Sequence, residues 1–331
     1  MLRTRITEML GIEHPIIGGA MMWLSRHELT AAVSAGGGLG ILASANYTDL
    51  DEFRDALGRV KDATDKPFGV NLNMFPSFRK LDNNLYLDVM EKEGVKIVET
   101  SGHRAPDHLA GRIKAAGMTL IHKCVAPRYA KKAESVGVDA VTVVGWENGG
   151  ATGVLDIATM VLIPRTVDAV SIPVIGGGGV GDGRGLAAIL ALGAEAAIVG
   201  TRFLAATEAP IHPRVRQEMI RRIESDTMLV MRSVQNTHRV LKTPNALKVR
   251  EMEARGADLD ELRTIIAGEN TSRMLTEGDL DSGILSLGQA VGFVREIKPA
   301  AEIIDEIARD AEDVFEKMEG IFGRGRGAPC A

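Results

Sequence analysis

Short apolar runs alternate, between about residue 15 and residue 204, with longer stretches in which apolar residues recur at helical spacing. The apolar runs predict strands near residues 15–19, 38–42, 68–72, 96–100, 119–124, 140–144, 172–175 and 196–199. Helical patterns follow them near residues 25–34, 49–61, 83–92, 106–116, 128–136, 158–169 and 184–192, with Ser25 as the expected N-cap of the first helix. Strands that are apolar almost throughout are typical of parallel strands covered on both faces.

This alternation predicts an α/β fold. Open doubly wound sheets produce the same pattern, but eight strand–helix units in about 200 residues favour a closed (β/α)8, or TIM, barrel over residues 1–207. Residues 208–278 carry charge-rich helical patterns, at 213–223, 245–254 and 259–266, and predict a smaller, mostly helical insertion beside the barrel mouth. Residues 279–322 then return to the barrel and end in a helix near 299–319, and we expect the tail at 323–331 to be disordered.

Composition and charge limit the binding partners and the cellular location that can be expected for this protein. The chain has 331 residues and a net charge of −5, which gives no support for a nucleic-acid or anionic-membrane partner. The two cysteines, Cys124 and Cys330, suit a reducing cytoplasm, and no apolar run reaches the roughly 18 residues of a membrane-spanning helix. We therefore expect a cytoplasmic protein with a small-molecule substrate, and the composition is compatible with a homo-oligomer. Metal-ligand spacings, a Walker loop and a nucleophile elbow are all absent, so no metal is expected.

A glycine-rich loop at residues 176–183 is the strongest local signal of a binding site. It lies between a predicted strand and a predicted helix, and such a strand–loop–helix start can bind a phosphate through backbone N–H groups and the helix dipole. The next strand also ends in a glycine, Gly200, followed by Thr201. Two such loops after consecutive late strands favour the phosphate site found after strands seven and eight of a TIM barrel.

Two other interpretations of this loop stay open. Gly176, Gly178 and Gly181 match the G-x-G-x-x-G dinucleotide fingerprint. That fingerprint normally opens the first βαβ unit and is followed by an acidic residue at the end of the next strand, which this chain lacks. The loop can also be a tight turn without a ligand.

The chain resembles the nitronate monooxygenase (2-nitropropane dioxygenase) family of FMN enzymes, especially its bacterial NADH:quinone reductase branch. The resemblance extends over nearly the whole chain, and it rests on residues 14–19, 35–39, 68–71, 121–124, 176–185 and 200–203. It implies a TIM barrel with a smaller inserted domain and an FMN across the C-terminal mouth of the barrel.

The resemblance also implies a set of cofactor-binding positions. The FMN phosphate would lie on the backbone of Gly178, Gly179, Gly200 and Thr201, and Asn71 and Lys123 would contact the flavin ring. Lys123 could stabilise negative charge on the reduced flavin, although a lysine at a strand end can also extend to solvent. Met21, with Met22 and Trp23, would form a wall beside the flavin. The complete expected set is Gly19, Ala20, Met21, Asn71, Lys123, Gly150, Gly177, Gly178, Gly179, Gly200, Thr201 and Gln289.

The chain departs from the family pattern after the sixth strand. Residues 145–153 read GWENGGATG, and Ala151 stands where the family usually has a histidine. Alanine can neither transfer a proton nor hydrogen-bond a nitronate. No other histidine is an obvious replacement, and His122 alternates with Lys123 along its strand, so the two should face opposite sides. Cys124 is expected to be a core residue.

These observations favour an FMN-dependent oxidoreductase in which NADH or NADPH reduces the flavin, and the flavin reduces a quinone or another electron-poor acceptor. Hydride transfer to a flavin depends on positioning more than on a protein acid, so it survives the loss of the histidine. The alternatives are a nitronate monooxygenase that oxidises alkyl nitronates with O2, an enoyl-thioester reductase, and a flavin-binding protein with little turnover.

Overall fold

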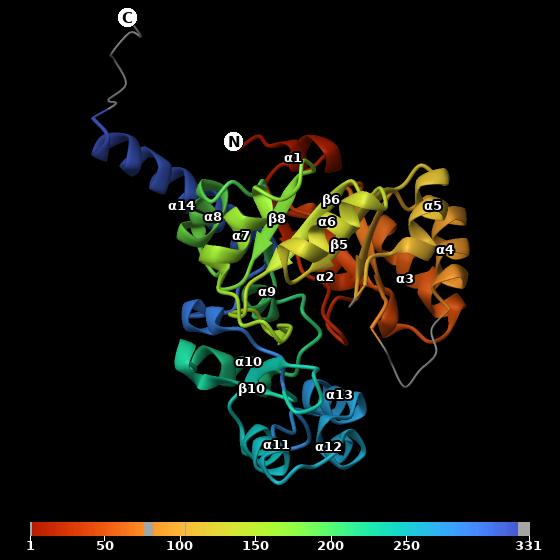
Figure 1. Cartoon of the computed structure of the whole chain (residues 1–331), viewed down its shortest axis with the longest axis vertical. Coiled ribbons are helices and arrows are strands. Elements are labelled where there is room, and N and C mark those ends of the chain that lie inside the picture. Colours follow the sequence, from red (N-terminus) through yellow and green to blue (C-terminus); the bar gives the residue numbers. More distant parts are fainter. Residues whose placement is uncertain (1, 76–81, 103, 324–331) are drawn as a thin grey trace, which may run out of the picture.

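Eight parallel strands form one sheet in the computed structural model, which describes residues 2–75, 82–102 and 104–323 (Figure 1). In sheet order they are β1 (Ile16–Gly18), β9 (Ala196–Val199), β8 (Val174–Gly177), β6 (Ala140–Val144), β5 (Thr119–Cys124), β4 (Ile97–Ser101), β3 (Phe68–Asn73) and β2 (Gly40–Ala43). The two edges meet through a parallel bridge between Ile17 and Leu39, where the Leu39 N–H donates to the Ile16 carbonyl at 2.9 Å. The predicted TIM barrel is therefore confirmed.

Helices cover the outside of the barrel between successive strands. They are α2 (His27–Ala35), α3 (Leu50–Ala63), α4 (Asn83–Lys92), α5 (Asp107–Ala115), α6 (Pro127–Ser135), α7 (Thr159–Val167), α8 (Gly183–Ala191), the short α9 (Thr201–Leu204) and the long α14 (Ala300–Ile321), which packs on α8 and α2. The expected N-cap Ser25 is wrong. Arg26 is the N-cap of α2, and the Ser25 hydroxyl instead accepts from the Met21 N–H at 2.9 Å and donates to the Gly19 carbonyl at 3.1 Å.

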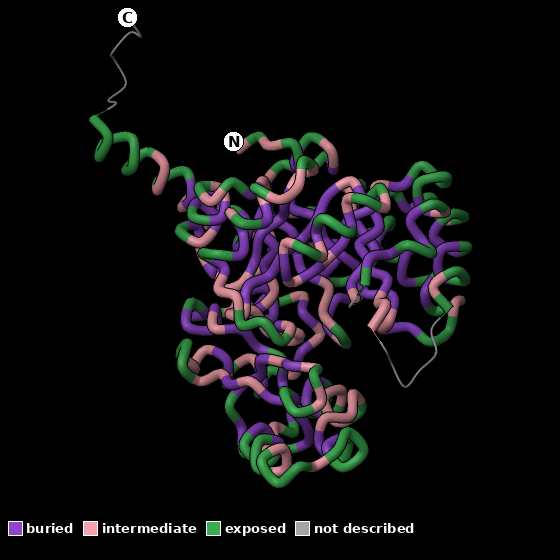
Figure 2. Tube along the Cα trace, viewed as in Figure 1, coloured by how far each residue is buried: buried purple, intermediate pink, exposed green. Residues whose placement is uncertain are grey.

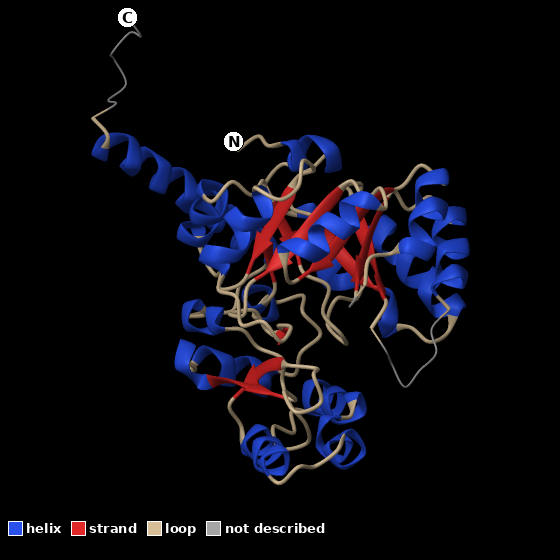
Figure 3. Cartoon of the chain, viewed as in Figure 1, coloured by secondary structure: helices blue, strands red, loops and turns tan. Residues whose placement is uncertain are grey.

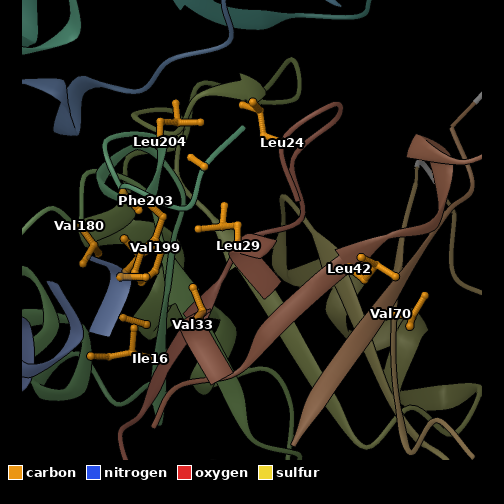
Figure 4. Close-up of a cluster of buried hydrophobic side chains, with 14 of the residues drawn as sticks. Ile16, Leu24, Leu29, Val33, Leu42, Val70, Val180, Val199, Phe203 and Leu204 are labelled. Carbon is orange, nitrogen blue, oxygen red and sulfur yellow. The ribbon is translucent and has the colours of Figure 1, made fainter. Parts of the chain in front are cut away.

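Two apolar layers hold the barrel together. The inner layer fills the barrel with alternate residues of the strands, and α1 (Arg5–Leu10), which was not predicted, adds Ile6 and Leu10 to it. The outer layer lies between the strands and the helices, and Figure 4 shows part of it, including Ile16, Val33 and Phe203. Because successive strand residues point to opposite layers, every second residue of each strand faces the inside of the barrel.

The insertion contains strands as well as the predicted helices (Figure 3). Its helices are α10 (Pro213–Ile220), α11 (Pro244–Ala254), α12 (Leu259–Ile266) and α13 (Gly268–Glu277). A three-stranded antiparallel sheet joins β10 (Thr227–Val230) and β11 (His238–Leu241) to β7 (Gly150–Ala151), which belongs to the loop after β6. These strands gave no signal in the sequence because none is longer than four residues, and β7 pairs with a segment that lies 87 positions away along the chain. The insertion is thus tied to the barrel mouth by backbone pairing.

The last segment packs against the barrel. It passes through η3 (Gln289–Phe293) and enters α14, whose apolar residues are buried up to Ala311 and whose far end is exposed (Figure 2). From residue 324 onward, the tail that was expected to be disordered lies outside the described residues. Among the described residues, no helix combines the length and apolar character needed to cross a membrane.

Candidate functional site

A polar layer lies above the apolar filling of the barrel, where β3, β4 and β5 end. Asn71 pairs in register with Glu99, and Ser101 pairs with Lys123. The Asn71 Nδ2 donates to Glu99 Oε2 at 2.6 Å, and the Lys123 ammonium lies 3.2 Å from the same oxygen. The positions two residues earlier on β4 and β5 are Ile97 and Ile121, which belong to the inner layer, so Glu99 and Lys123 face the inside of the mouth.

Glu99 is the centre of this polar layer, and the sequence analysis did not single it out. Its side chain is 1% exposed, and its Oε1 has no hydrogen-bond partner in the part of the chain that the structure describes. A buried carboxylate needs a cation or donors nearby, and Lys123 and Asn71 supply both. The lysine side chain is 21% exposed, and its ammonium keeps further N–H donors for a ligand in the mouth. The alternative of a lysine extended into solvent is therefore not what the structure has.

Two neighbours of Lys123 on β5 are structural. The His122 side chain faces outward and its Nδ1 lies 2.9 Å from the Thr100 hydroxyl, so the predicted alternation with Lys123 is confirmed. Burial lowers the pKa of His122 to about 4, so this ring is neutral at pH 7. Burial raises the pKa of the Cys124 thiol to about 12, which makes it an unreactive core residue as predicted.

The glycine loop after β8 divides into two halves with different roles. In the first half, Gly178 and Gly179 have φ values of 106° and 76°, a conformation that favours glycine. The backbone N–H groups of Gly178, Gly179 and Gly200 have no hydrogen-bond acceptor among the residues that the structure describes. Since β8 and β9 are adjacent parallel strands, these amides lie at one corner of the mouth.

The three glycines differ in how much space a side chain would have beside the backbone. A Cβ on Gly178 would lie 2.4 Å from the Thr159 hydroxyl, so packing of the protein itself already requires glycine there. A Cβ on Gly179 would meet only Glu147 Cβ at 3.7 Å, and one on Gly200 only Met21 Sδ at 3.8 Å. Open space therefore lies in front of Gly179 and Gly200, as a bound phosphate would need.

The second half of the loop is held in place by a helix cap and by close packing. The Asp182 carboxylate caps α8, accepting from the N–H groups of Arg184 and Gly185 at 3.1 and 3.3 Å. A Cβ on Gly181 would lie 2.6 Å from the Phe293 ring, and one on Gly183 would lie 2.4 Å from the backbone of α14. The expected contribution of the start of α8 to an anion site is therefore wrong, because a carboxylate already occupies it. Packing against Phe293 also explains why Gly181, the third glycine of the dinucleotide fingerprint, is a glycine.

The loop after β6 is held by the returning segment. The Glu147 carboxylate accepts from the N–H and hydroxyl of Thr159 at the start of α7, at 3.1 and 2.8 Å. A Cβ on Gly149 would lie 2.7 Å from the Gly288 nitrogen, so the two backbones pack against each other. The Gln289 N–H donates to the Glu147 carbonyl at 3.0 Å. Gly150 and Ala151 form β7 in this loop, and the structure thus places Gln289 against it.

The same returning segment reaches the glycine corner, which is formed by Gly178, Gly179 and Gly200. The Gly288 N–H donates to the Thr201 hydroxyl at 3.0 Å, directly after Gly200. On the other side of this corner, the Gly19 N–H donates to the Val199 carbonyl at 2.9 Å, and Met21 lies beside Gly200. Residues 19–21 therefore line the mouth, whereas Met22 is 50% exposed and Trp23 lies against Gly268 of the insertion.

The expected positions thus gather around one mouth, on loops after β1, β6, β8 and β9, on the inner faces of β3 and β5, at the last residue of β8 and, for Gln289, on the returning segment. No group of three or more histidine, cysteine or acidic residues in the described segments could hold a metal ion.

We predict a measurable energetic coupling between Lys123 and Glu99. Lys123→Met should destabilise the flavin-free protein because it leaves a buried carboxylate unpaired, and Glu99→Gln should restore part of that loss. We expect a coupling free energy of about 1–3 kcal/mol, at the low end of buried pairs because the ammonium is partly exposed. Urea unfolding of the two single variants and the double variant measures it.

The exposed pair Lys132–Asp107, with 2.9 Å between charged atoms, is the matched control. Lys132→Met and Asp107→Asn should show no measurable coupling. A coupling free energy near zero for both the Lys123–Glu99 pair and the Lys132–Asp107 pair would mean that the Lys123–Glu99 contact does not stabilise the mouth.

Comparison with known proteins places the chain in a family. The family model described as nitronate monooxygenase matches residues 3–310. A Rhodococcus jostii protein named (3aS,4S,5R,7aS)-5-hydroxy-7a-methyl-1-oxo-octahydro-1H-indene-4-carboxyl-CoA dehydrogenase is 35% identical, over 94% of this chain and 96% of that protein. A probable nitronate monooxygenase of Staphylococcus aureus is 31% identical over 69% of this chain and 75% of its own length. The structure of FabK from Thermotoga maritima has a TM-score of 0.90 at 36% identity and covers 97% of this chain and 100% of that one. The chain therefore belongs to the nitronate monooxygenase family of flavin-dependent oxidoreductases.

Proposed function

We propose that this chain is an FMN-dependent oxidoreductase that takes electrons from NADH or NADPH and passes them to a quinone or another electron-poor acceptor. The observation that carries the proposal is the geometry of the mouth. A glycine corner with open space, whose amides have no acceptor among the described residues, faces the same opening as the buried Asn71–Glu99–Lys123 layer. One end suits a phosphate and the other suits a polar ring system that gains negative charge.

The residues fit an FMN at both ends. The N–H groups of Gly178, Gly179, Gly200 and Thr201 would bind the phosphate, and Asn71 and Lys123 would contact the ring. Gly19, Ala20, Met21, Gly150, Gly177 and Gln289 complete the proposed wall of the site. When bound, FMN supplies two-electron chemistry that amino-acid side chains cannot.

Each side chain of the polar layer has a distinct role in this proposal. The Lys123 ammonium places positive charge where the ring becomes negative on reduction, and Glu99 holds it there by the 3.2 Å contact. The Asn71 amide donates to the Glu99 carboxylate at 2.6 Å, which fixes the orientation of the Asn71 side chain. The Asn71 carbonyl oxygen in turn accepts from the Ser101 hydroxyl. These residues bind and orient; none of them needs to transfer a proton.

The loop after β6 bears on the choice of acceptor. Ala151 offers neither donor nor acceptor in its side chain, so it cannot assist the proton chemistry of a small nitronate. An enoyl thioester is a further candidate acceptor, and CoA thioesters are supported as a substrate class by a relative, aligned over 94% of this chain, that is named a carboxyl-CoA dehydrogenase. Nitronate oxidation is the second candidate, supported by the relatives named probable nitronate monooxygenase. The proposal also keeps the cytoplasm as the location, which suits the buried free thiol of Cys124.

Gly200→Val should weaken FMN binding while leaving the fold intact. The residue has φ −117°, which any amino acid can adopt, and its Cβ would meet only Met21 Sδ at 3.8 Å. A hydrogen bond to a charged group contributes about 1.5–3 kcal/mol, so losing one amide contact should raise the Kd at least about tenfold. Quenching of FMN fluorescence on titration with flavin-free protein measures the Kd.

Gly111→Val provides the control, because this glycine of α5 has open space around it and lies far from the glycine corner. It should bind FMN as the wild type does. An unchanged Kd in a folded Gly200→Val protein would refute this placement of the phosphate.

Anaerobic stopped-flow spectroscopy tests the reaction itself. NADH or NADPH should bleach the FMN absorbance of the loaded protein, and menadione or crotonyl-CoA should restore it, with free FMN as the control. Bleaching by propionate 3-nitronate and by neither nucleotide would replace the proposal with nitronate oxidation. Absence of bleaching by all three would leave a flavin-binding protein.

A further inference from the structure

The barrel strands carry a single acid and a single base, and the two form a pair. In the eight barrel strands, all of which the structure describes, Glu99 is the only carboxylate and Lys123 the only ammonium or guanidinium. Their charged atoms are 3.2 Å apart, and both side chains face the inside of the mouth. His122 adds no charge at pH 7, because burial lowers its pKa to about 4. The polar layer of the mouth therefore has no net charge.

Water screens the carboxylate of this pair only weakly. The Glu99 side chain is 1% exposed, whereas that of Lys123 is 21% exposed. Among the described residues, Lys123 is the only cation paired with Glu99, and the neutral Asn71 amide donates to the same carboxylate oxygen at 2.6 Å. Buried charges interact more strongly and over longer distances than charges in water. A ring bound at the mouth is therefore exposed to the field of the carboxylate as well as to that of the ammonium.

We propose that Glu99 sets the reduction potential of the bound FMN by neutralising Lys123, so that electrons pass from the reduced cofactor to the acceptor more readily. This inference rests on the proposed function. A ring that takes up two electrons and one proton gains one negative charge. An unpaired ammonium beside it would strongly favour the reduced form, and the nearby carboxylate offsets that preference. Glu99 is thus a positioning residue that needs no contact with the cofactor, because it acts through the charge of Lys123.

Neutralisation of Lys123 balances the two halves of the proposed reaction. Any factor by which the mouth prefers reduced over oxidised FMN makes reduction by NADH or NADPH more favourable. The same factor makes electron transfer to the acceptor less favourable. A lysine alone would already favour a ring that becomes negative, and burying a carboxylate beside it costs desolvation. The presence of Glu99 therefore indicates a site built to give electrons away as well as to receive them.

Variants that change the charge of the polar layer test this role. Glu99→Gln keeps the shape of the side chain but leaves the layer positive, so reduced FMN should gain at least about tenfold in affinity relative to oxidised FMN. For a two-electron couple, a tenfold change raises the midpoint potential by about 30 mV. The double variant Glu99→Gln/Lys123→Met again has no net charge in the layer and should return close to the wild-type potential. Anaerobic titration of the FMN-loaded proteins with dithionite, in the presence of an indicator dye, measures the potentials.

Two further variants complete the design. Asp107→Asn removes the carboxylate of the exposed Lys132–Asp107 pair and should leave the midpoint potential unchanged, because water and salt screen that charge. Glu99→Leu fills a similar volume without any charge and should show the same rise as Glu99→Gln, so the test does not depend on the folding of one variant.

The sign of the shift distinguishes this role from a purely structural one. If Glu99 only held Lys123 in place, Glu99→Gln would release the ammonium, and the midpoint potential would fall or stay the same. Either result would overturn the inference, as would a double variant that keeps the full rise, or a wild-type protein that binds no FMN. Dithionite needs no nucleotide, so loss of bleaching by NADH and NADPH with the expected potentials intact would refute the proposed function but not the role of Glu99. Bleaching by a nucleotide without a rise in Glu99→Gln would refute the role of Glu99 alone.

Discussion

Closure of the barrel is the constraint on which the rest of this structure depends. Once β1 and β2 meet at the Ile17–Leu39 bridge, each strand residue faces either the inside or the outside of the barrel, and the inward residues form successive layers. The lower layers are mainly isoleucine, with leucine, valine and alanine, and the layer at the mouth is polar. Glu99 can be buried there only because the closed register brings Asn71 and Lys123 to it from the two neighbouring strands.

Glycine contacts then fix the loops around that polar layer. Gly149 packs on Gly288, Gly178 on Thr159, and Gly183 on α14, each with a separation that no Cβ would allow. These contacts join the loop after β6, the loop after β8 and the returning segment into one rim. The insertion is attached to the same rim through β7, so the mouth is built from almost the entire length of the chain.

Sequence alone predicted the parts of this account that depend on local pattern. The eight barrel strands, most helices and the opposite directions of His122 and Lys123 follow from apolar runs and strand alternation. Glu99 could have been found by the same parity, since it lies two residues after the inward Ile97 in an otherwise apolar strand. The capping of α8 by Asp182 was also readable, because aspartate before a helix is a strong N-cap signal. The pairing of His238 with Ala151 was not, because it joins residues 87 positions apart in strands too short to have a pattern of their own. The steric requirement for glycine at position 178 could not be predicted either, since Thr159 approaches Gly178 only in the folded chain.

The central claim is that one mouth holds one FMN, with a single phosphate at the corner formed by Gly178, Gly179, Gly200 and Thr201. Heat-denaturing the purified protein, separating the released flavin by chromatography and quantifying it against the chain concentration tests this claim most directly. The account predicts noncovalent FMN at close to one molecule per chain, because open space in front of the backbone is found at a single glycine corner, whereas the second half of the loop packs on Phe293 and α14 and is capped by Asp182. Release of FAD, or of no flavin from protein that has been supplied with FMN, would contradict it.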